Sequence, residues 1–261
     1  MIVLNELDWA EDAIQSHSLG NKPYETLCRV AKYYAHDGYK KQKIRNALET
    51  FLLQCDPNVS IPKWSDVLDY AVKRALKQPA IKIDCIPITK AELDKIDELE
   101  GKQIRRLAFT LLCLAKYYDD INPNGDHWVN CEDTEIMKMA NISTSIRRQS
   151  GMYHQLWKMG MIQFSKKIDN TNVRVLYMDT SRKNDDVAIE VRDFRNLGYQ
   201  YMMHHGEPFF VCESCGITTK IKNPGVGRRQ KYCPTCAAAI HIRQSVNSVM
   251  RHRNKAKAAN V

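Results

Sequence analysis

Residues 212–236 read CESCGITTKIKNPGVGRRQKYCPTC, with two Cys-x2-Cys pairs separated by 17 residues. Four thiolates at this spacing fit the tetrahedral geometry that zinc prefers. Four protein ligands leave no open position for a catalytic water, so a structural role is expected for the metal. The sequence therefore predicts Zn2+ as a cofactor, with Cys212, Cys215, Cys233 and Cys236 as its ligands.

An iron–sulfur cluster or a redox pair is the alternative for these cysteines, since thiolate ligands alone do not identify the metal. The Lys and Arg residues around them favour zinc. His204, His205 and His241 are expected to be ordinary surface or packing residues, because four cysteines already complete the site. The other cysteines are scattered singly and are expected in the core or in incidental positions: Cys28, Cys55, Cys85, Cys113 and Cys131.

The positive charge of the chain is confined to its last segment. Residues 216–261 contain ten Lys and Arg and no Asp or Glu, whereas the formal net charge of the whole chain is +9. Residues 1–215 are therefore close to neutral. A field concentrated in this way suits a phosphate backbone, which proteins bind by displacing its counterions. The other interpretation is a basic tail that only improves solubility.

The composition is that of a soluble globular protein, with 44% hydrophobic and 26% charged residues. No apolar run approaches the roughly 20 residues that a membrane span needs. The N-terminus does not resemble a signal peptide, because it carries Glu6, Asp8, Glu11 and Asp12. We therefore expect a cytoplasmic protein with reduced thiols and two or three domains.

Residues 209–261 are predicted to form one small domain around the cysteines. Ile217–Ile221, a turn at Asn223–Gly225 and the approach to Tyr232 indicate a β-hairpin between the two cysteine pairs. The sequence from Ala237 onward indicates a helix. This pattern resembles a treble-clef or zinc-ribbon finger, and the resemblance covers about residues 210–253.

Residues 1–80 are predicted to form a helical domain. Apolar residues recur at spacings of three and four in Tyr24–His36, Lys40–Cys55 and Trp64–Lys77. The boundary to the next domain is expected between Lys77 and Thr89. Several aromatic side chains of this domain are expected in its core, although such rings can also stack on bases: Tyr33, Tyr34, Tyr39, Trp64 and Tyr70.

A middle domain is predicted over residues 88–180. Thr89-Lys-Ala-Glu92 is a capping box, so a helix is expected to begin near Lys90. A long helix around Ile104–Ala115 and a short one at Asp133–Ala140 follow.

A third helix is expected after Asn141, which tolerates the left-handed conformation that ends a helix. Ser143 is expected to be its N-cap, and the helix is expected to run to Met159. Met161–Ile168 and Val173–Met178, joined by a turn at 169–172, then indicate a β-hairpin.

A helical wheel separates two faces of this third helix. The side expected to point to the core carries Ile146, Ser150, Tyr153, Leu156 and Trp157. The other side is basic and amide-bearing, without an acid, and carries Thr144, Arg147, Arg148, Gly151, Gln155 and Lys158. Side chains of this kind reach phosphates and base edges.

Three helices closed by a hairpin resemble the winged helix-turn-helix family. The resemblance covers about residues 104–179 and rests on Glu135-Ile-x3-Ala-Asn-Ile-Ser143, Leu156-x3-Gly-Met-Ile162 and the hairpin. It implies that the third helix enters the major groove of DNA and that the hairpin touches the DNA backbone or minor groove. The alternative is a winged helix used only for protein contacts.

No enzymatic activity is predicted. The segment from Gly216 onward has no carboxylate to hold a catalytic cation or to activate water, which argues against a metal-dependent nuclease. Acidic pairs such as Asp119-Asp120, Glu132-Asp133 and Asp185-Asp186 are interpreted as helix ends or loops. Residues 181–208 are expected to connect the two flanking domains, with a strand at Val187–Val191.

These patterns together predict a fold that is mainly α with small β parts: a helical N-terminal domain, a winged helix and a zinc finger with a terminal helix. The expected function is that of a zinc-containing DNA-binding protein. The arrangement resembles replication-organising or regulatory proteins of bacteriophages and mobile elements, which implies a role in replication or transcription control.

The expected partner is duplex DNA, with no membrane and no small-molecule substrate. Two other classes stay open, a modulator of a host polymerase or defence complex and an RNA- or single-strand-binding protein. The residues expected to contact nucleic acid are Thr144, Arg147, Arg148, Gln155, Lys158, Lys166, Lys167, Arg174, Arg228, Arg229, Lys231, Arg243, Arg251, Arg253, Lys255 and Lys257.

Overall fold

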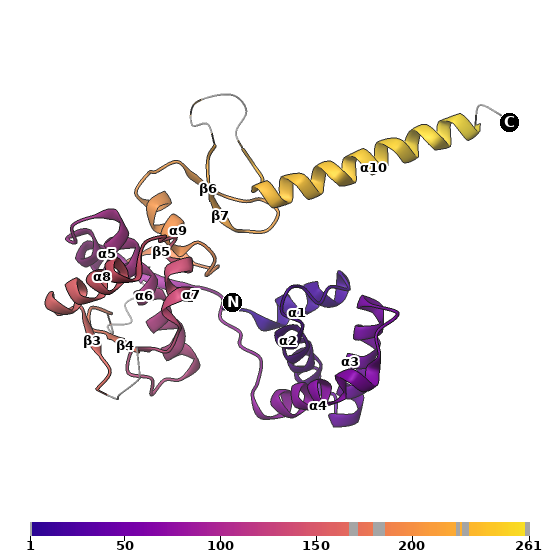
Figure 1. The fold of residues 1–261 in the computed structure, drawn as a ribbon, viewed down its shortest axis with the longest axis horizontal. Coiled ribbons are helices and arrows are strands. Elements are labelled where there is room, and N and C mark those ends of the chain that lie inside the picture. Colours follow the sequence, from indigo (N-terminus) through magenta and orange to yellow (C-terminus); the bar gives the residue numbers. More distant parts are fainter. Residues whose placement is uncertain (1, 167–171, 180–185, 223–224, 226–229, 259–261) are drawn as a thin grey trace. The chain divides into compact units, whose positions relative to one another are not determined.

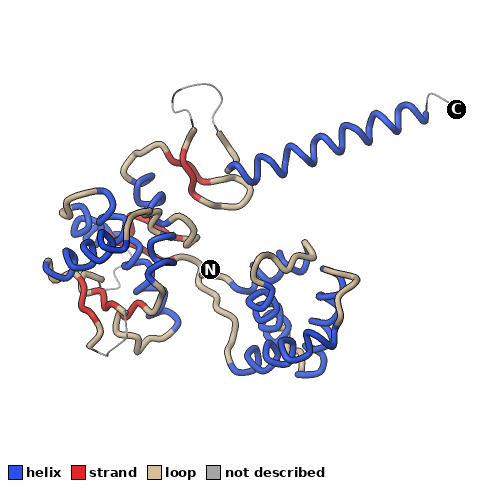
Figure 2. Tube along the Cα trace, in the orientation of Figure 1, coloured by secondary structure: helices blue, strands red, loops and turns tan. Residues whose placement is uncertain are grey.

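Helices dominate the computed structural model, which describes residues 2–166, 172–179, 186–222, 225 and 230–258, and side chains as far as Arg251 (Figures 1 and 2). Within these ranges three small sheets accompany the helices, which confirms the prediction of a mainly α chain with small β parts. The chain divides into two units, residues 1–86 and 87–261. Within the described ranges, no helix has the length and apolar character that crossing a bilayer requires.

Unit 1 consists of helices packed around an apolar core that includes Leu27, Ile44 and Phe51. The first of these helices has no counterpart among the predicted ones. Its signal is Asn5, whose side-chain oxygen accepts hydrogen bonds from the N–H groups of Leu7 (3.1 Å) and Asp8 (3.2 Å) and so caps the helix. The helices are α1 (Glu6–Gln15), α2 (Pro23–His36), α3 (Lys41–Cys55) and α4 (Ile61–Lys77).

A buried ion pair holds the two ends of unit 1 together. Glu6 and Lys32 are 7% and 6% exposed, and Lys32 Nζ donates to Glu6 Oε2 over 2.7 Å. The same oxygen accepts the backbone N–H of Ile81 over 2.9 Å. A buried carboxylate is stable only when such partners replace its water. Glu6 therefore fixes the position of α1 relative to α2 and to the segment after α4.

Most of the aromatic side chains expected in the core of unit 1 do pack against it. Tyr33, Tyr34, Tyr39 and Trp64 are partly buried at its edge. Tyr70 does not follow the prediction, because its side chain is 60% exposed on α4. The core-facing side of α4 is formed instead by Leu68, Ala71 and Val72.

Unit 2 begins with a short strand that leads into a capped helix, as the capping box predicts. Thr89 Oγ1 accepts the N–H of Glu92 and the Glu92 carboxylate accepts the N–H of Thr89. The elements of this unit are β1 (Ile86–Thr89), α5 (Lys90–Asp97), α6 (Lys102–Ile121), β2 (Trp128–Val129), α7 (Asp133–Met139), α8 (Ile146–Lys158), β3 (Ile162–Phe164), β4 (Val173–Val175), β5 (Val187–Val191), α9 (Leu197–His204), β6 (Phe209–Val211), β7 (Thr218–Lys220) and α10 (Pro234–Ala258).

Helix α6 is the centre of unit 2, and most of its side chains from Ile104 to Ala115 are buried. Beside it lies Glu92, which is fully buried. Its carboxylate accepts Lys116 Nζ (2.7 Å) from α6, the N–H of Thr89 (2.9 Å) and the N–H of Asp179 (2.8 Å). One satisfied carboxylate thus ties the junction of β1 and α5 and the segment around Asp179 to the central helix.

The turn between α7 and α8 contains Asn141 in the left-handed conformation, with φ +55°, as predicted. The predicted N-cap is wrong, because α8 begins two residues later with Ser145 at its N-cap. The carbonyl of Ser145 accepts the N–H groups of Arg148 and Gln149. Ser143, Thr144 and Ser145 are all suitable caps, and only tertiary packing selects among them.

The core-facing side of α8 agrees with the prediction at Tyr153 and Leu156 but differs at its other positions. Met152, Tyr153 and Leu156 are buried, while Ile146 is 79% and Trp157 is 47% exposed. Ser150 is exposed as well. The prediction assigned Ile146 and Trp157 to the core because they are the large apolar residues at the two ends of the helix. In the structure, Met152 provides the core contact instead.

Strands β2, β4 and β3 form an antiparallel sheet in that order. Ile162 pairs with Val175 and Phe164 with Val173, so the predicted hairpin is present. Its predicted turn at 169–172 lies largely outside the described residues. Strand β2 adds Val129 next to Val173 on the other edge of β4.

The segment after β4 packs into unit 2 through β5 and α9. Strand β5 lies at the position predicted for it and pairs with β1. The ring of Phe194 lies 5.4 Å from that of Tyr117, and the ring of Tyr201 lies 5.5 Å from that of Phe109, measured between ring centroids. Both partner rings belong to α6, so α9 is part of the core around this helix.

Gly198, at the start of α9, touches the turn between α7 and α8. A Cβ atom there would overlap the carbonyl oxygen of Ala140 and lie 2.6 Å from its carbonyl carbon. Gly151 on α8 is the matched control, because a Cβ there would meet no atom within 4 Å.

We expect Gly198→Ala to lower the free energy of unfolding of unit 2 by about 3 kcal/mol, because the added methyl group forces α9 away from the turn. Gly151→Ala should raise it by about 0.5–1 kcal/mol through its better helix propensity. Denaturant titration of the full chain measures both changes. Similar effects of the two substitutions would contradict the close contact at Gly198.

Candidate metal centre and basic surfaces

The four predicted cysteines come together in unit 2. One sulfur atom from each of Cys212, Cys215, Cys233 and Cys236 lies within 4.8 Å of all the others. Cys212 and Cys233 are buried, while Cys215 and Cys236 are half-buried. Among the described residues, no other group of three or more His, Cys, Asp or Glu side chains is arranged to share an ion.

The first cysteine pair forms the turn of a β-hairpin. Strands β6 and β7 pair antiparallel, with Val211 opposite Thr218, and the N–H of Cys212 donates to the carbonyl of Ile217 over 3.0 Å. Gly216 closes this turn with φ +73°, a conformation that favours glycine. Its N–H donates to the carbonyl of Cys212 over 2.9 Å.

This geometry corrects the predicted hairpin between the two cysteine pairs. The strand expected at Ile217–Ile221 is present as β7, but its partner precedes the first pair instead of following it. Most of the turn predicted at Asn223–Gly225 lies outside the described residues. The reason for the difference is that the Cys-x2-Cys segment itself reverses the chain.

The second cysteine pair lies at the N-terminus of α10, which begins at Pro234; the helix predicted from Ala237 onward is present and starts within the second cysteine pair. The N–H of Cys233 donates to the sulfur of Cys212 over 3.2 Å, and the N–H of Cys236 points to the sulfur of Cys233 at 3.5 Å. Backbone N–H groups directed at sulfur favour thiolates, as does the positive end of a helix.

The thiols of the first pair differ in acidity. Burial raises the pKa of Cys212, but hydrogen bonds from the backbone N–H groups of Cys233, Cys215 and Ser214 outweigh burial and lower it overall. Burial raises the pKa of Cys215, and the neighbouring thiols add to that rise. Cys212 is therefore the more acidic thiol of the first pair, and a bound dication would favour the thiolate form of its ligands.

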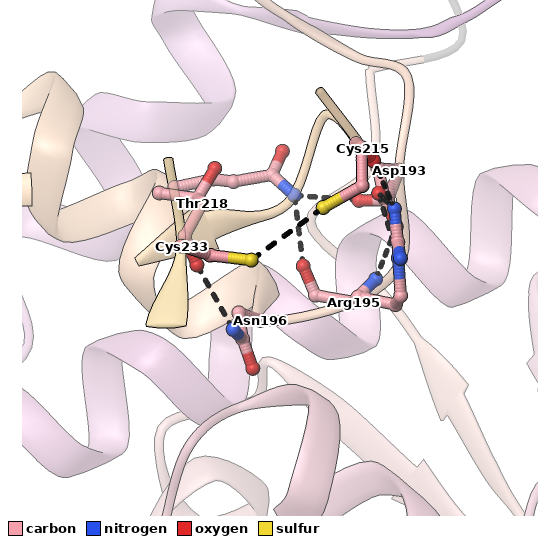
Figure 3. Close-up of polar contacts among 7 residues, drawn as sticks. Asp193, Arg195, Asn196, Cys215, Thr218 and Cys233 are labelled. Carbon is pink, nitrogen blue, oxygen red and sulfur yellow. Dashed lines mark hydrogen bonds and ion pairs between the residues drawn. The ribbon is translucent and has the colours of Figure 1, made fainter. Parts of the chain in front are cut away.

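Arg195 and Asn196 attach the hairpin β6–β7 to the start of α9 (Figure 3). The guanidinium of Arg195 donates to the carbonyl of Cys215 over 2.5 Å and is held in place by Asp193. Asn196 Nδ2 donates to the carbonyl of Thr218 over 2.9 Å. Sequence reasoning missed both residues, since each acts through contacts with residues about 20 positions away.

The same contacts continue to the turn before α8. Asn141 Nδ2 donates to Asn196 Oδ1 over 2.8 Å, and the N–H of Tyr199 donates to Asn141 Oδ1 over 3.1 Å. Asn196 also has a positive φ, +57°. Two left-handed asparagines thus connect the hairpin β6–β7 with the helix that carries the predicted basic face.

The donor set fits zinc in a closed structural site. Four sulfur donors complete a tetrahedron, and two of them are buried from solvent. Within the described residues, the group consists of the four cysteines without His204, His205 or His241. His205 Nε2 lies 3.2 Å from Asp97 Oδ1 instead, and burial lowers the pKa of His204.

The basic residues predicted on α8 are exposed. Arg147, Arg148, Gln155 and Lys158 all lie on its surface. Thr144 is half-buried, and its carbonyl accepts Gln149 Nε2 over 3.0 Å.

The predicted residues of the hairpin and the C-terminal segment have different environments. Lys166 is exposed, whereas Arg174 is bound by Asp126 through its guanidinium and is half-buried in the central strand β4. Lys231 forms an exposed ion pair with Glu213 at 3.5 Å. Arg243 and Arg251 are exposed and have no acidic partner within the described part of the chain. Lys167, Arg228, Arg229 and the side chains of Arg253, Lys255 and Lys257 lie outside it.

Comparisons of this chain with models of protein families, with curated proteins and with solved structures found no match. The interpretation of the metal centre therefore rests on its donor atoms and their surroundings. The interpretation of the basic surfaces rests on their charge and exposure.

We expect the double substitution Cys233→Ser and Cys236→Ser to abolish stoichiometric binding of zinc, because two ligands remain out of four. Elemental analysis of the purified full chain measures the metal content. The control is Cys55→Ser, which removes a half-buried thiol outside the cluster and should leave the metal content unchanged. One equivalent of metal retained in the double variant would exclude this site.

We expect Arg195→Ala to weaken zinc binding about tenfold, because it removes a cation and a hydrogen bond next to the Cys215 ligand. Competition with a chelator measures the affinity in the full chain. Arg192→Ala is the control, since Arg192 is exposed and pairs with Glu190. Equal affinities of the two variants would show that Arg195 has no role in supporting the ligand.

Proposed function

We propose that this chain is a zinc-containing, non-enzymatic protein that binds duplex DNA. The observation that carries the proposal is the segregation of charge. Residues 216–261 hold ten Lys and Arg without an acid, next to a cysteine cluster that fits a structural metal. A polyanion is the partner that such a segment binds most strongly, through release of its counterions.

The order of elements around α8 supports DNA as the polyanion. Helix α6, strand β2, helices α7 and α8, and the hairpin β3–β4 follow one another in the order of a winged helix. In that class, the helix corresponding to α8 enters the major groove. The exposed side chains of Arg147, Arg148, Gln155 and Lys158 are of the types that contact phosphates and base edges.

Zinc has a structural role in this proposal. Four cysteine ligands leave no position for a water or a substrate, so the ion would only join the hairpin β6–β7 to the start of α10. A hairpin and a helix that each supply two cysteines resemble a treble-clef finger. The resemblance to regulatory and replication-organising proteins of phages implies an intracellular role in replication or transcription control.

A second candidate function is binding of a protein partner through α8. Ile146 is 79% and Trp157 is 47% exposed on this helix, and the Trp157 ring stacks on His154 with 5.2 Å between ring centroids. Exposed apolar and aromatic side chains of this kind are typical of protein interfaces. Such a protein would bind naked DNA weakly.

Fluorescence anisotropy with random duplex DNA, single-stranded DNA and RNA separates these possibilities. We expect the duplex to bind best, and the logarithm of its affinity to fall with the logarithm of salt by about 0.9 for each phosphate contact. Preference for single strands or RNA would favour the other nucleic-acid class. Negligible binding to all three would contradict the proposal and favour a protein partner.

We expect the double substitution Arg147→Ala and Arg148→Ala to reduce discrimination between a duplex selected by the wild-type protein and random duplex by about tenfold, because base contacts are lost. Affinity for random duplex should fall less. The control is Lys40→Ala with Lys41→Ala, which removes two exposed cations from unit 1. Equal losses on selected and random duplex would contradict a recognition role for α8.

A further inference from the structure

Helix α10 has an apolar stripe that nothing covers in the described part of the chain. The helix spans 25 residues as one continuous element (Figure 1), and every side chain from His241 to Arg251 is exposed. Ile242 is 64%, Val246 48%, Val249 50% and Met250 59% exposed. A helix with this much unpacked apolar surface and several β-branched residues gains little stability on its own in water.

The stripe has the spacing of a coiled-coil seam. Ile242, Val246 and Val249 follow one another at intervals of four and three, and Ala239 continues the pattern towards the N-terminus. These intervals place Ala239 and Val246 at a positions and Ile242 and Val249 at d positions of a heptad. Apolar residues at both the a and the d positions form a seam against which a parallel helix with the same pattern can pack.

Charge divides α10 into two halves. Between Ala239 and Met250 the sequence contains a single cation, Arg243, and no acid. The following residues, 251–257, contain four cations: Arg251, Arg253, Lys255 and Lys257. The first half of the helix is therefore suited to an apolar contact and the second half to a polyanion.

We propose that a second copy of this chain covers the stripe, with the two α10 helices parallel and in register along residues 239–250. The g positions that flank the seam are Ala238 and Ser245, so Arg243 at an e position of one copy faces no like charge on the other. An acidic helix of a different protein would meet only one cation beside the seam, Arg243, so charge does not favour it over a second copy. Pairing also brings the two basic halves side by side.

The proposed pairing rests on the α10 stripe alone, whereas the grip of the paired basic halves on DNA rests on the proposed function. Residues 239–250 make up fewer than two full heptads and bury well below the roughly 1,200 Å2 of a stable complex, so a weak dimer is expected. Repulsion between the basic halves opposes pairing and is screened by salt. Self-association should therefore strengthen as salt rises, opposite to binding of DNA.

Sedimentation velocity of the metal-loaded full chain, without nucleic acid, tests the inference. We expect the dimer fraction to grow with concentration between about 5 and 200 μM, and to be larger at about 0.5 M than at about 0.05 M salt. A monomer under all these conditions would overturn the inference. Since no DNA is present, a monomer would not contradict the proposed binding of DNA. A dimer that fails to bind DNA would support the pairing of α10 and contradict the proposed function.

The seam is tested by Val246→Glu with Val249→Glu, which should leave a monomer at every salt concentration. The matched control is Asn247→Glu with Ser248→Glu, which adds the same charge to neighbouring exposed positions outside the seam and should keep the dimer. Metal content shows that both variants keep the cysteine centre. Equal dimer fractions in the two variants would exclude the stripe as the interface.

The register is tested by a photo-crosslinking amino acid in place of Val246. Crosslinks to residues 239–250 of a second copy, identified by mass spectrometry, are expected for parallel helices in register. Crosslinks confined to other segments of the chain would contradict the proposed pairing, even if a dimer forms.

Discussion

The contact between the start of α9 and the turn before α8 is the constraint on which unit 2 depends. Gly198 lies so close to the carbonyl of Ala140 that no side chain fits between them. Asn141 and Asn196 both have positive φ and bond to each other across this contact, while Asn196 also holds the carbonyl of Thr218. Asparagine adopts this backbone conformation more readily than most residues and offers both a donor and an acceptor. The hairpin β6–β7 and the helices around α6 are therefore parts of one structure.

Each unit also contains one buried carboxylate with a lysine partner. Glu6 bonds to Lys32 and to the N–H of Ile81, and Glu92 bonds to Lys116 and two backbone N–H groups. Burying such pairs contributes little net stability, because desolvation offsets the attraction between the charges. Leaving one partner alone is costly, however, so arrangements that separate the segments are disfavoured. These carboxylates select one packing of the segments that they join around each core.

Local signals made much of this structure predictable. The Thr89–Glu92 capping box forms both of its hydrogen bonds, Asn141 has the expected left-handed conformation, and the four cysteines converge. Prediction failed where several neighbouring residues suited the same role or where a strand was too short to show a pattern. Three consecutive capping residues hid the start of α8, and the short strand β6 has no periodic pattern that would identify it as the partner of β7. Arg195 was missed because its role arises only when the hairpin folds back onto α9.

Backbone hydrogen bonds join the first and the last segments of unit 1. The N–H of Ile83 donates to the carbonyl of Leu4 over 2.9 Å, and the N–H of Glu6 donates to the carbonyl of Ile81 over 2.8 Å. The entrance and the exit of the chain therefore lie next to each other on this unit. A domain whose ends are adjacent can be inserted, lost or exchanged between genes without distorting the segments on either side. Unit 1 has this geometry.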